Sequence, residues 1–188
     1  QRIYNFLDDE KFPPQPPERC TLADDNEKIV MHISNFRPVK RVTDVVRVFK
    51  RIIEKVDATL VMVGDGPEHM SAVGVAKQLG ISDRIRYLGT TERIENFLPC
   101  ADLLIQPSEH ESFGLVHLEA MSCGVPVLGT DSGGVAEVVE HGVSGYLAEV
   151  GDIDSMAQFA IDVLTNEERA REMGRQGKER ARTHFRKA

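Results

Sequence analysis

In residues 107–124, "PSEHESFGLVHLEAMSCG", two of the glutamates flank a turn that contains a glycine. The residue types and their spacing suit a ligand that is anionic and rich in hydroxyl groups. The turn follows an apolar run of strand length and precedes an expected helix over residues 115–122. Backbone amides at a helix amino terminus bind anions through hydrogen bonds and the helix dipole. A diphosphate is therefore predicted to bind the amides of Ser112, Phe113, Gly114 and Leu115, and the missing side chain of Gly114 permits close approach.

The glutamates are Glu111, in the loop, and Glu119, which lies about one and a half turns inside the expected helix. Carboxylates accept strong hydrogen bonds from hydroxyl groups, so the two could bind different parts of one extended ligand. A purely structural role stays open on these residues alone, because helix starts attract acids through the helix dipole.

A second pair of candidate residues follows the first expected strand, "KIVMHIS", in the loop "SNFRPVKR". Arg37 and Lys40 place two cations at the carboxyl end of that strand, where they could neutralise a departing anionic group. Two cations at a helix start oppose the helix dipole, so a structural role explains them less well than a functional one.

The remaining motifs give weaker indications of a binding or catalytic site. "GDGP", Gly64 to Pro67, lacks the third glycine of a dinucleotide fingerprint, because His69 stands there, and this argues against a nicotinamide-dependent dehydrogenase. We interpret it as a tight turn with Pro67 at the first helical position. The six histidines show no metal-ligand spacing, so no metal site is predicted, and His110 is expected to face solvent.

Strand-like and helix-like patterns alternate along the chain and predict an α/β fold, a Rossmann-like doubly wound parallel sheet. Ligands of such sheets bind beyond the carboxyl ends of the strands. Residues 1–27 are expected to be a linker, 28–165 the binding domain, and 166–188 a C-terminal helix that is either solvated or docked on another domain. The expected strands are 28–34, 58–64, 84–89, 103–107 and 126–129, and the expected helices are 40–56, 67–80, 92–100, 115–122, 134–140 and the tail 152–185.

Composition narrows the class of protein. The 188 residues carry a net charge of −7, which disfavours nucleic-acid binding, and the apolar runs are too short to span a membrane. The amino end shows no secretion-signal pattern, so a cytoplasmic location is expected, and a start without Met suggests an excised piece. Three widely spaced cysteines, Cys20, Cys100 and Cys123, are expected to be reduced thiols.

The Glu-x7-Glu spacing, together with "ESFGLV", "EAMSCGVPV" and "GGVAEVVEHGVSGYL", resembles the carboxyl-terminal domain of the family 4 retaining glycosyltransferases. The resemblance runs from about Ile3 to Phe185. It implies one half of a two-domain GT-B fold, in which this domain binds the sugar donor. The acceptor would bind mainly to an amino-terminal domain that this chain lacks.

The resemblance also implies residue roles. Glu119 would bind the ribose hydroxyls, Glu111 the sugar hydroxyls, and the amides of residues 112–115 the diphosphate or sugar. The loop that begins at Gly89 and Thr90 would contact the base through its backbone. The family usually separates its Arg and Lys by four residues, whereas two separate Arg37 from Lys40, so Lys40 transfers more safely and Arg37 occupies a shifted place.

The implied function is the donor half of a retaining glycosyltransferase that uses a UDP-sugar and requires no metal or other cofactor. The "SNFR" loop narrows the resemblance to members that transfer N-acetylglucosamine from UDP to a small hydroxy acid such as L-malate. The chain alone is expected to be inactive. Two alternatives stay open: a family 4 hexosyltransferase domain with another donor or acceptor, and an isolated UDP-sugar-binding module without turnover.

Overall fold

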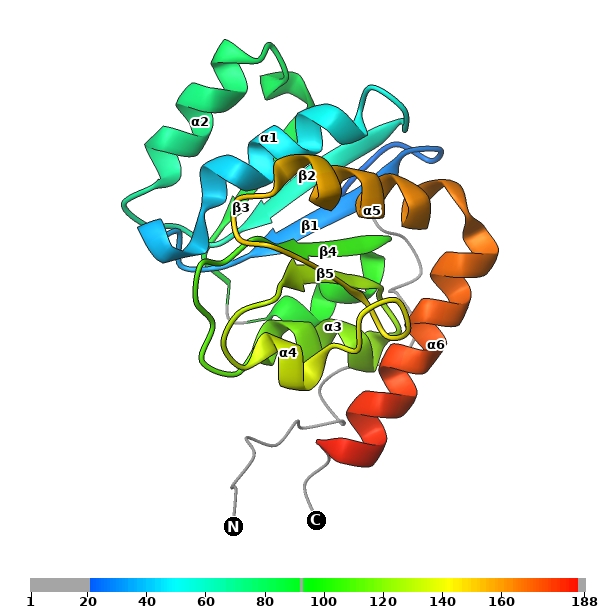
Figure 1. Ribbon diagram of the computed structural model, residues 1–188. Coiled ribbons are helices and arrows are strands. Elements are labelled where there is room, and N and C mark those ends of the chain that lie inside the picture. The colour runs from blue at the N-terminus through cyan, green and yellow to red at the C-terminus, as the bar shows by residue number, and fades with distance from the viewer. Residues whose placement is uncertain (1–20, 92, 186–188) are drawn as a thin grey trace.

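Six parallel strands form the centre of the molecule (Figure 1), as described by a computed structural model for residues 21–91 and 93–185. The strands are β1 (Lys28–Ile33), β2 (Ala58–Val63), β3 (Ile85–Gly89), β4 (Leu103–Gln106), β5 (Val127–Thr130) and β6 (Tyr146–Ala148). Their order in the sheet is β3-β2-β1-β4-β5-β6, and every neighbouring pair is parallel. The predicted doubly wound parallel sheet is confirmed.

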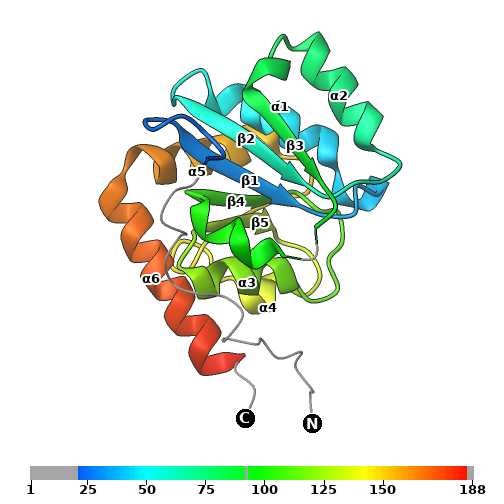
Figure 2. The ribbon, with the colours of Figure 1, turned by 180° about the vertical axis from the view of Figure 1, so that it is seen from behind.

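Helices cover both faces of this sheet (Figures 1 and 2). One face carries α1 (Val42–Ile52), α2 (His69–Gln78) and α5 (Ile153–Thr165), and the other carries α3 (Leu115–Cys123) and α4 (Val135–Val138). The helical spacing of apolar residues predicts which side of α1 is buried: Val45, Val46 and Phe49 are fully buried in the first of two hydrophobic clusters. The last helix, α6 (Glu167–His184), packs against α3.

The strand order places a topological switch point between β1 and β4. From β1 the chain moves outward through β2 to β3, then returns to β4 beside β1 and moves outward the other way to β6. At such a topological switch point the loops after the two central strands diverge toward opposite faces, which opens a binding site at their carboxyl ends. This edge lies at the left in Figure 1, where α1 begins.

Several local predictions are wrong. The helix expected over 92–100 is two short 3-10 helices, Ile94–Asn96 and Leu98–Cys100, and Pro67 precedes α2, which begins at His69. The expected helical tail divides at Asn166, whose side chain accepts a hydrogen bond from the Arg169 amide and so caps α6. The short edge strand β6 was not predicted.

The cysteine prediction is corrected at one position. Cys100 is disulfide-bonded, which contradicts the expected reduced thiol, whereas Cys123 is a buried free thiol. A disulfide is more typical of oxidising compartments. The cytoplasmic location stays a prediction, and Cys20, for which a reduced thiol was also expected, lies outside the described residues.

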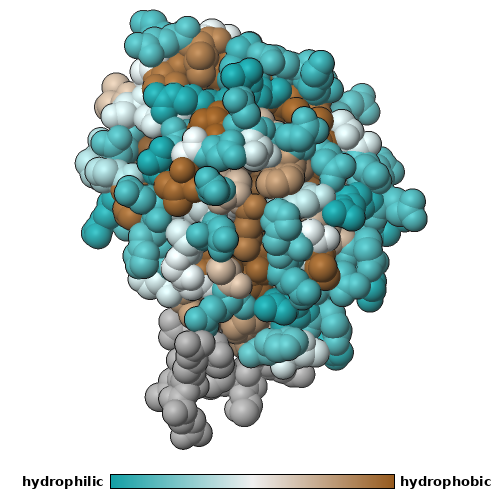
Figure 3. All heavy atoms as spheres, viewed as in Figure 1, coloured by the Kyte–Doolittle hydropathy of each residue, from teal (hydrophilic) through white to brown (hydrophobic). Residues whose placement is uncertain are grey.

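The surface is mostly hydrophilic on the face seen in Figure 3, where hydrophobic residues form separate patches. Within the described ranges, no helix is long and apolar enough to cross a membrane. In the structure β1 begins at Lys28 and α5 ends at Thr165, and the expected division of the chain at residues 28 and 165 stays a prediction. Most of the expected linker lies outside the described residues, and docking of α6 on another domain stays a prediction.

Candidate functional site

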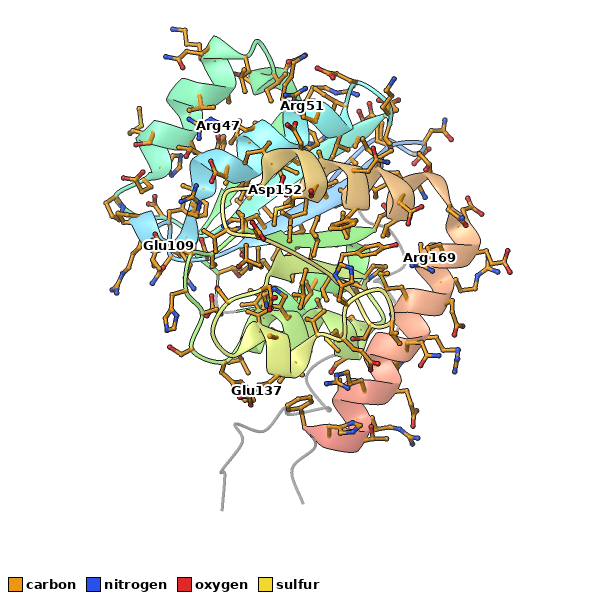
Figure 4. All side chains as sticks on the ribbon, viewed as in Figure 1. Arg47, Arg51, Glu109, Glu137, Asp152 and Arg169 are labelled. Atoms are coloured by element: carbon orange, nitrogen blue, oxygen red, sulfur yellow. The ribbon has the colours of Figure 1, made fainter. Side chains whose placement is uncertain are left out.

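The predicted site residues follow the carboxyl ends of the strands. Arg37 and Lys40 lie in the loop after β1, Thr90 follows β3, and residues 111–115 follow β4. The loops after β1 and β4 are joined by a backbone hydrogen bond of 2.8 Å from the Glu109 amide to the Val39 carbonyl. Figure 4 shows Glu109 on this edge, beside the start of α1. The fold therefore collects residues that are up to 78 positions apart at one edge.

An ion pair between Lys40 and Glu111 lies at the switch point. Lys40 Nζ is 2.5 Å from Glu111 Oε2, and the two side chains are only 19% and 24% exposed. The sequence predicts a role for each residue, but their direct pairing was not predicted. Arg37 differs, because it is exposed and forms no ion pair within the described residues. The structure therefore brings Lys40, and not Arg37, into contact with Glu111.

The turn from Glu111 into α3 has the form that anion binding requires. Gly114 is the N-cap of α3 at φ 80°, in the left-handed region that favours glycine. In the part of the chain that the structure describes, no side chain caps this helix start. The first amides of α3, from Leu115 onward, therefore retain hydrogen-bonding capacity for a ligand.

Two glycines after β5 hold this turn in place, and sequence reasoning missed their role. The Gly134 amide donates a 2.8 Å hydrogen bond to the Glu111 carbonyl. A Cβ at Gly133 would overlap that carbonyl oxygen, and one at Gly134 would lie 2.5 Å from the Ser112 carbonyl oxygen. The signal was present in the sequence as a Gly-Gly pair in the loop that follows a strand.

The side chains of Phe113 and Leu115, in the turn before α3 and at its start, have structural surroundings. The Phe113 ring contacts the Phe185 ring edge-on at a centroid distance of 6.0 Å, which ties the turn to the residue that ends α6. Leu115 is 42% exposed at the start of α3. Ligand binding by the backbone at these positions stays a prediction.

Glu119 is a partly buried carboxylate on α3. Burial raises its pKa to about 7, and the nearby carboxylate of Glu95 adds to the shift. Its side chain accepts no hydrogen bond within residues 21–91 and 93–185. A partly buried acceptor with unused capacity is suited to bind hydroxyl groups.

Two buried histidines lie within electrostatic reach of the Lys40–Glu111 pair, and neither was predicted as part of the site. His32 in β1 bonds through Nδ1 to the Ile105 carbonyl at 2.9 Å and through Nε2 to the Ser34 hydroxyl at 2.8 Å. His117 in α3 is 1% exposed, and neither ring nitrogen has a hydrogen-bond partner among the described residues. Burial lowers the pKa of both to about 4, so both are neutral at pH 7.

The "GDGP" turn supports the loop that carries Lys40. Gly64 and Gly66 have φ angles of 123° and 156°, and an added Cβ would overlap the carbonyl oxygens of Ser34 and Asn35 respectively. The turn thus fixes the start of the "SNFR" loop by close backbone contact. This agrees with its interpretation as a tight turn near the site.

The remaining predicted residues lie at the border of the site. Thr90 is exposed beside Gly89, whose carbonyl accepts a 2.7 Å hydrogen bond from the Gly64 amide. His110 is exposed, as predicted. The described residues contain no group of three or more His, Cys, Asp or Glu side chains placed to hold a metal ion.

The sequence is similar to a known protein family and to several of its members. The family described as "Glycosyl transferases group 1" matches residues 18–180. N-acetyl-alpha-D-glucosaminyl L-malate synthase of Bacillus anthracis is 46% identical over 99% of the chain and 50% of its own length. D-inositol 3-phosphate glycosyltransferase of Mycolicibacterium smegmatis is 35% identical over 76% of the chain and 34% of its own length. The chain thus spans half or less of the length of these relatives.

Solved structures show the same architecture. HepE of Anabaena in complex with UDP and glucose has a TM-score of 0.81 at 27% identity, over 86% of this chain and 45% of that protein. Sucrose-phosphate synthase of Thermosynechococcus elongatus has a TM-score of 0.87 at 25% identity, over 97% of this chain and 47% of that protein. The C-terminal domain of a group 1 glycosyl transferase of Francisella tularensis, solved by itself, matches over 97% of this chain at a TM-score of 0.84 and 20% identity. The fold expected for one half of a GT-B protein is confirmed.

Proposed function

Because the chain belongs to the group 1 glycosyl transferases, we propose that the carboxyl edge of its sheet binds a UDP-sugar as the donor half of a glycosyltransferase. The observation that carries this proposal is the meeting of Lys40 and Glu111 in front of the uncapped start of α3. A cation, an acid and free amides converge there at the switch point of the sheet. This is the set of groups that a diphosphate joined to a sugar requires.

Each part of the donor has a proposed partner. The amides of residues 112–115 and the ammonium of Lys40 bind the diphosphate, and exposed Arg37 adds a second cation from the same loop. Glu111 accepts hydrogen bonds from the sugar hydroxyls, while Glu119 accepts them from the ribose. The backbone from Gly89 to Thr90 contacts the base.

The identity of the donor and acceptor rests on relatives. HepE binds UDP and glucose, which supports a uridine nucleotide at this edge. The Bacillus anthracis relative is a synthase of N-acetylglucosaminyl L-malate. We therefore propose UDP-N-acetylglucosamine as the donor and a small hydroxy acid such as L-malate as the acceptor, with an amino-terminal domain that supplies most of the acceptor site.

The proposed chemistry is transfer with retained anomeric configuration. Negative charge grows on the leaving diphosphate as the bond to the sugar breaks, and preorganised cations and amides lower the barrier by stabilising that charge. Lys40 and the α3 amides would supply this stabilisation. The proposal contains no metal step, so chelation with EDTA should leave turnover unchanged.

A titration tests the donor site. We expect UDP to release heat on binding to the chain, NAD to release almost none, and Glu119→Ala to weaken UDP binding by about tenfold, because the ribose loses a charge-assisted acceptor. UDP affinity that is unchanged in Glu119→Ala would contradict the ribose assignment. Equal heats for NAD and UDP would contradict the nucleotide-sugar site itself.

A chimera tests the reaction. The amino-terminal half of the Bacillus anthracis relative, fused before this chain, should release UDP from UDP-N-acetylglucosamine only when L-malate is present. The second candidate is a binding module without turnover. A folded chimera that binds UDP and releases none from the donor would favour that module.

A further inference from the structure

The Lys40–Glu111 ion pair occupies two groups that the proposed donor needs. The pair joins the loops after β1 and β4, and its 2.5 Å separation leaves both side chains about four-fifths buried. Each group is assigned to a different part of the ligand, Lys40 to the diphosphate and Glu111 to the sugar. Full use of both groups by the donor requires the pair to divide.

We propose that this pair makes the site select a nucleoside diphosphate that carries a sugar over the bare nucleoside diphosphate. The proposal rests on the proposed function, since it assumes that the diphosphate binds before α3. A diphosphate that draws Lys40 away leaves the carboxylate of Glu111 without its cation. The hydroxyls of an attached sugar donate hydrogen bonds to the Glu111 carboxylate in place of Lys40, whereas a bare nucleoside diphosphate has no sugar hydroxyls at this position.

The cost of the unpaired carboxylate makes this difference measurable. Removal of one partner from a buried ion pair is strongly destabilising, because the remaining charge is neither hydrated nor paired. A sugar hydroxyl that donates to a carboxylate forms a charge-assisted bond that offsets much of this cost. Binding of the bare nucleotide is weakened by the full penalty.

Other charged groups near Glu111 do not relieve this penalty. His32 and His117 lie within electrostatic reach of Glu111, but burial lowers the pKa of each to about 4 and keeps both neutral. Arg37 is exposed and forms no ion pair in the described part of the chain. Among the described residues, the selection therefore depends on Lys40 and Glu111.

The consequence for a transferase is preferential release of its product. Once the sugar has left, the nucleotide no longer supplies hydroxyls to Glu111, and the carboxylate regains its most stable partner by pairing with Lys40. Re-formation of the ion pair competes with the diphosphate for the same ammonium. The site thus binds its product more weakly than its substrate.

Titration calorimetry with UDP and UDP-N-acetylglucosamine tests this selection. The wild-type chain should bind UDP-N-acetylglucosamine about tenfold more tightly than UDP. In Glu111→Gln, which keeps the shape and removes the charge, Lys40 is free before binding, so UDP should bind about tenfold more tightly than it binds the wild type. The preference for the sugar nucleotide should fall to about twofold or less, because the neutral amide carries little penalty when unpaired.

Two variants separate release of the pair from a general change in charge. Glu109→Gln removes one negative charge from the same loop, and the Glu109 side chain is exposed and forms no hydrogen bond with any described residue (Figure 4). It should leave both affinities unchanged. Glu111→Asp keeps the charge but shortens the reach to Lys40, and should tighten UDP binding by about threefold.

The outcomes distinguish this proposal from the proposed function. Wild-type binding of UDP with no tightening in Glu111→Gln would overturn the selection and leave the donor site standing. Equal tightening in Glu109→Gln would overturn it as well, because a field effect would then explain the result. A folded wild-type chain that binds neither nucleotide would overturn both proposals.

Discussion

Two regions of the molecule differ in whether their polar side chains are paired with one another. Around the edge strand β6, the Tyr146 hydroxyl donates to Asp162 at 2.7 Å and accepts from Arg169 at 2.8 Å. At the carboxyl edge, Glu119 has a raised pKa and His117 has no hydrogen-bond partner among the described residues. One region gains stability from internal pairs, whereas the other retains polar groups whose capacity is available to a ligand.

The positions of the two regions match this difference. Figure 4 shows Arg169 on α6, far along the molecule from Glu109 at the carboxyl edge. The group formed by Tyr146, Asp162 and Arg169, here called the β6–α6 cluster, joins three elements. Tyr146 is buried, whereas the side chains of Asp162 and Arg169 are about half-exposed. Its loss should reduce stability without affecting binding. Changes at the carboxyl edge should affect binding, and some of them should increase stability.

The largest effect is expected from Gly133→Ala. Gly133 has φ 58°, and an added Cβ would overlap the Glu111 carbonyl oxygen, so the turn before α3 must move. We expect the free energy of unfolding to fall by more than about 3 kcal/mol and UDP binding to be lost. Urea unfolding and calorimetry would measure the two effects.

Gly142→Ala is the matched control beside the β6–α6 cluster. Gly142 also has a left-handed φ, 77°, but no described atom lies within 4 Å of an added Cβ there. Only backbone strain should lower the free energy of unfolding, by about 1 kcal/mol, and UDP affinity should not change. Equal costs at the two glycines would show that contact with the Glu111 turn is unimportant.

Glu119→Gln should separate stability from binding. The pKa of Glu119 is raised from 4.5 to about 7, so its contribution to stability is fully present below about pH 4.5 and is lost as pH rises through 7. The variant should therefore match the wild type near pH 4 and be more stable by about 1–2 kcal/mol at pH 8, after allowance for partial exposure. UDP binding should weaken by about tenfold.

Glu95→Gln is the control for this variant, because it removes the like charge next to Glu119 and leaves the acceptor in place. It should stabilise the chain less than Glu119→Gln at pH 8 and change UDP affinity by no more than about twofold. If Glu119→Gln lowered stability at pH 8, Glu119 would be a structural group and the two regions would not differ.

Tyr146→Phe should give the opposite pattern. The change removes the hydroxyl that joins Asp162 to Arg169 while the ring keeps its stacking on Phe159. We expect the free energy of unfolding to fall by about 1 kcal/mol, since both former partners are about half-exposed and can be hydrated. UDP affinity should stay within experimental error of the wild type, and a weaker UDP complex would link the two regions.

The sequence predicted the parts of the fold that depend on local pattern. The spacing of Val45, Val46 and Phe49 fixes the buried side of α1, and continuous apolar runs identify the central strands. Strand β6 is only three residues long, Tyr146–Ala148, too short for such a pattern. The residues 92–100 contain Pro99, which interrupts the helix that their composition favours.

The predicted site was a set of separate residues, and the structure adds their relations. Lys40 and Glu111 were both singled out, but their contact joins positions 71 residues apart and depends on β4 returning beside β1. His117 was missed because one histidine in an apolar helix gives no periodic or spacing signal. The contact of Gly133 with the Glu111 turn is likewise a tertiary relation that a Gly-Gly pair only suggests.

A modest effect at pH 7, but the sharpest test of the contrast, is expected from His117→Leu. Both ring nitrogens are buried without a described partner, and leucine removes that cost while it keeps the site apolar. We expect a gain of about 1 kcal/mol in the free energy of unfolding at pH 7. The pKa of His117 is lowered to about 4, so the stability that depends on its neutral form is present above about pH 6.5 and lost as pH falls toward 4. The advantage of the variant should therefore grow by about 1 kcal/mol between pH 7 and pH 5.5 in urea unfolding. A loss of stability at pH 7 would mean that His117 is satisfied by a bound partner, and the carboxyl edge would then resemble the β6–α6 cluster.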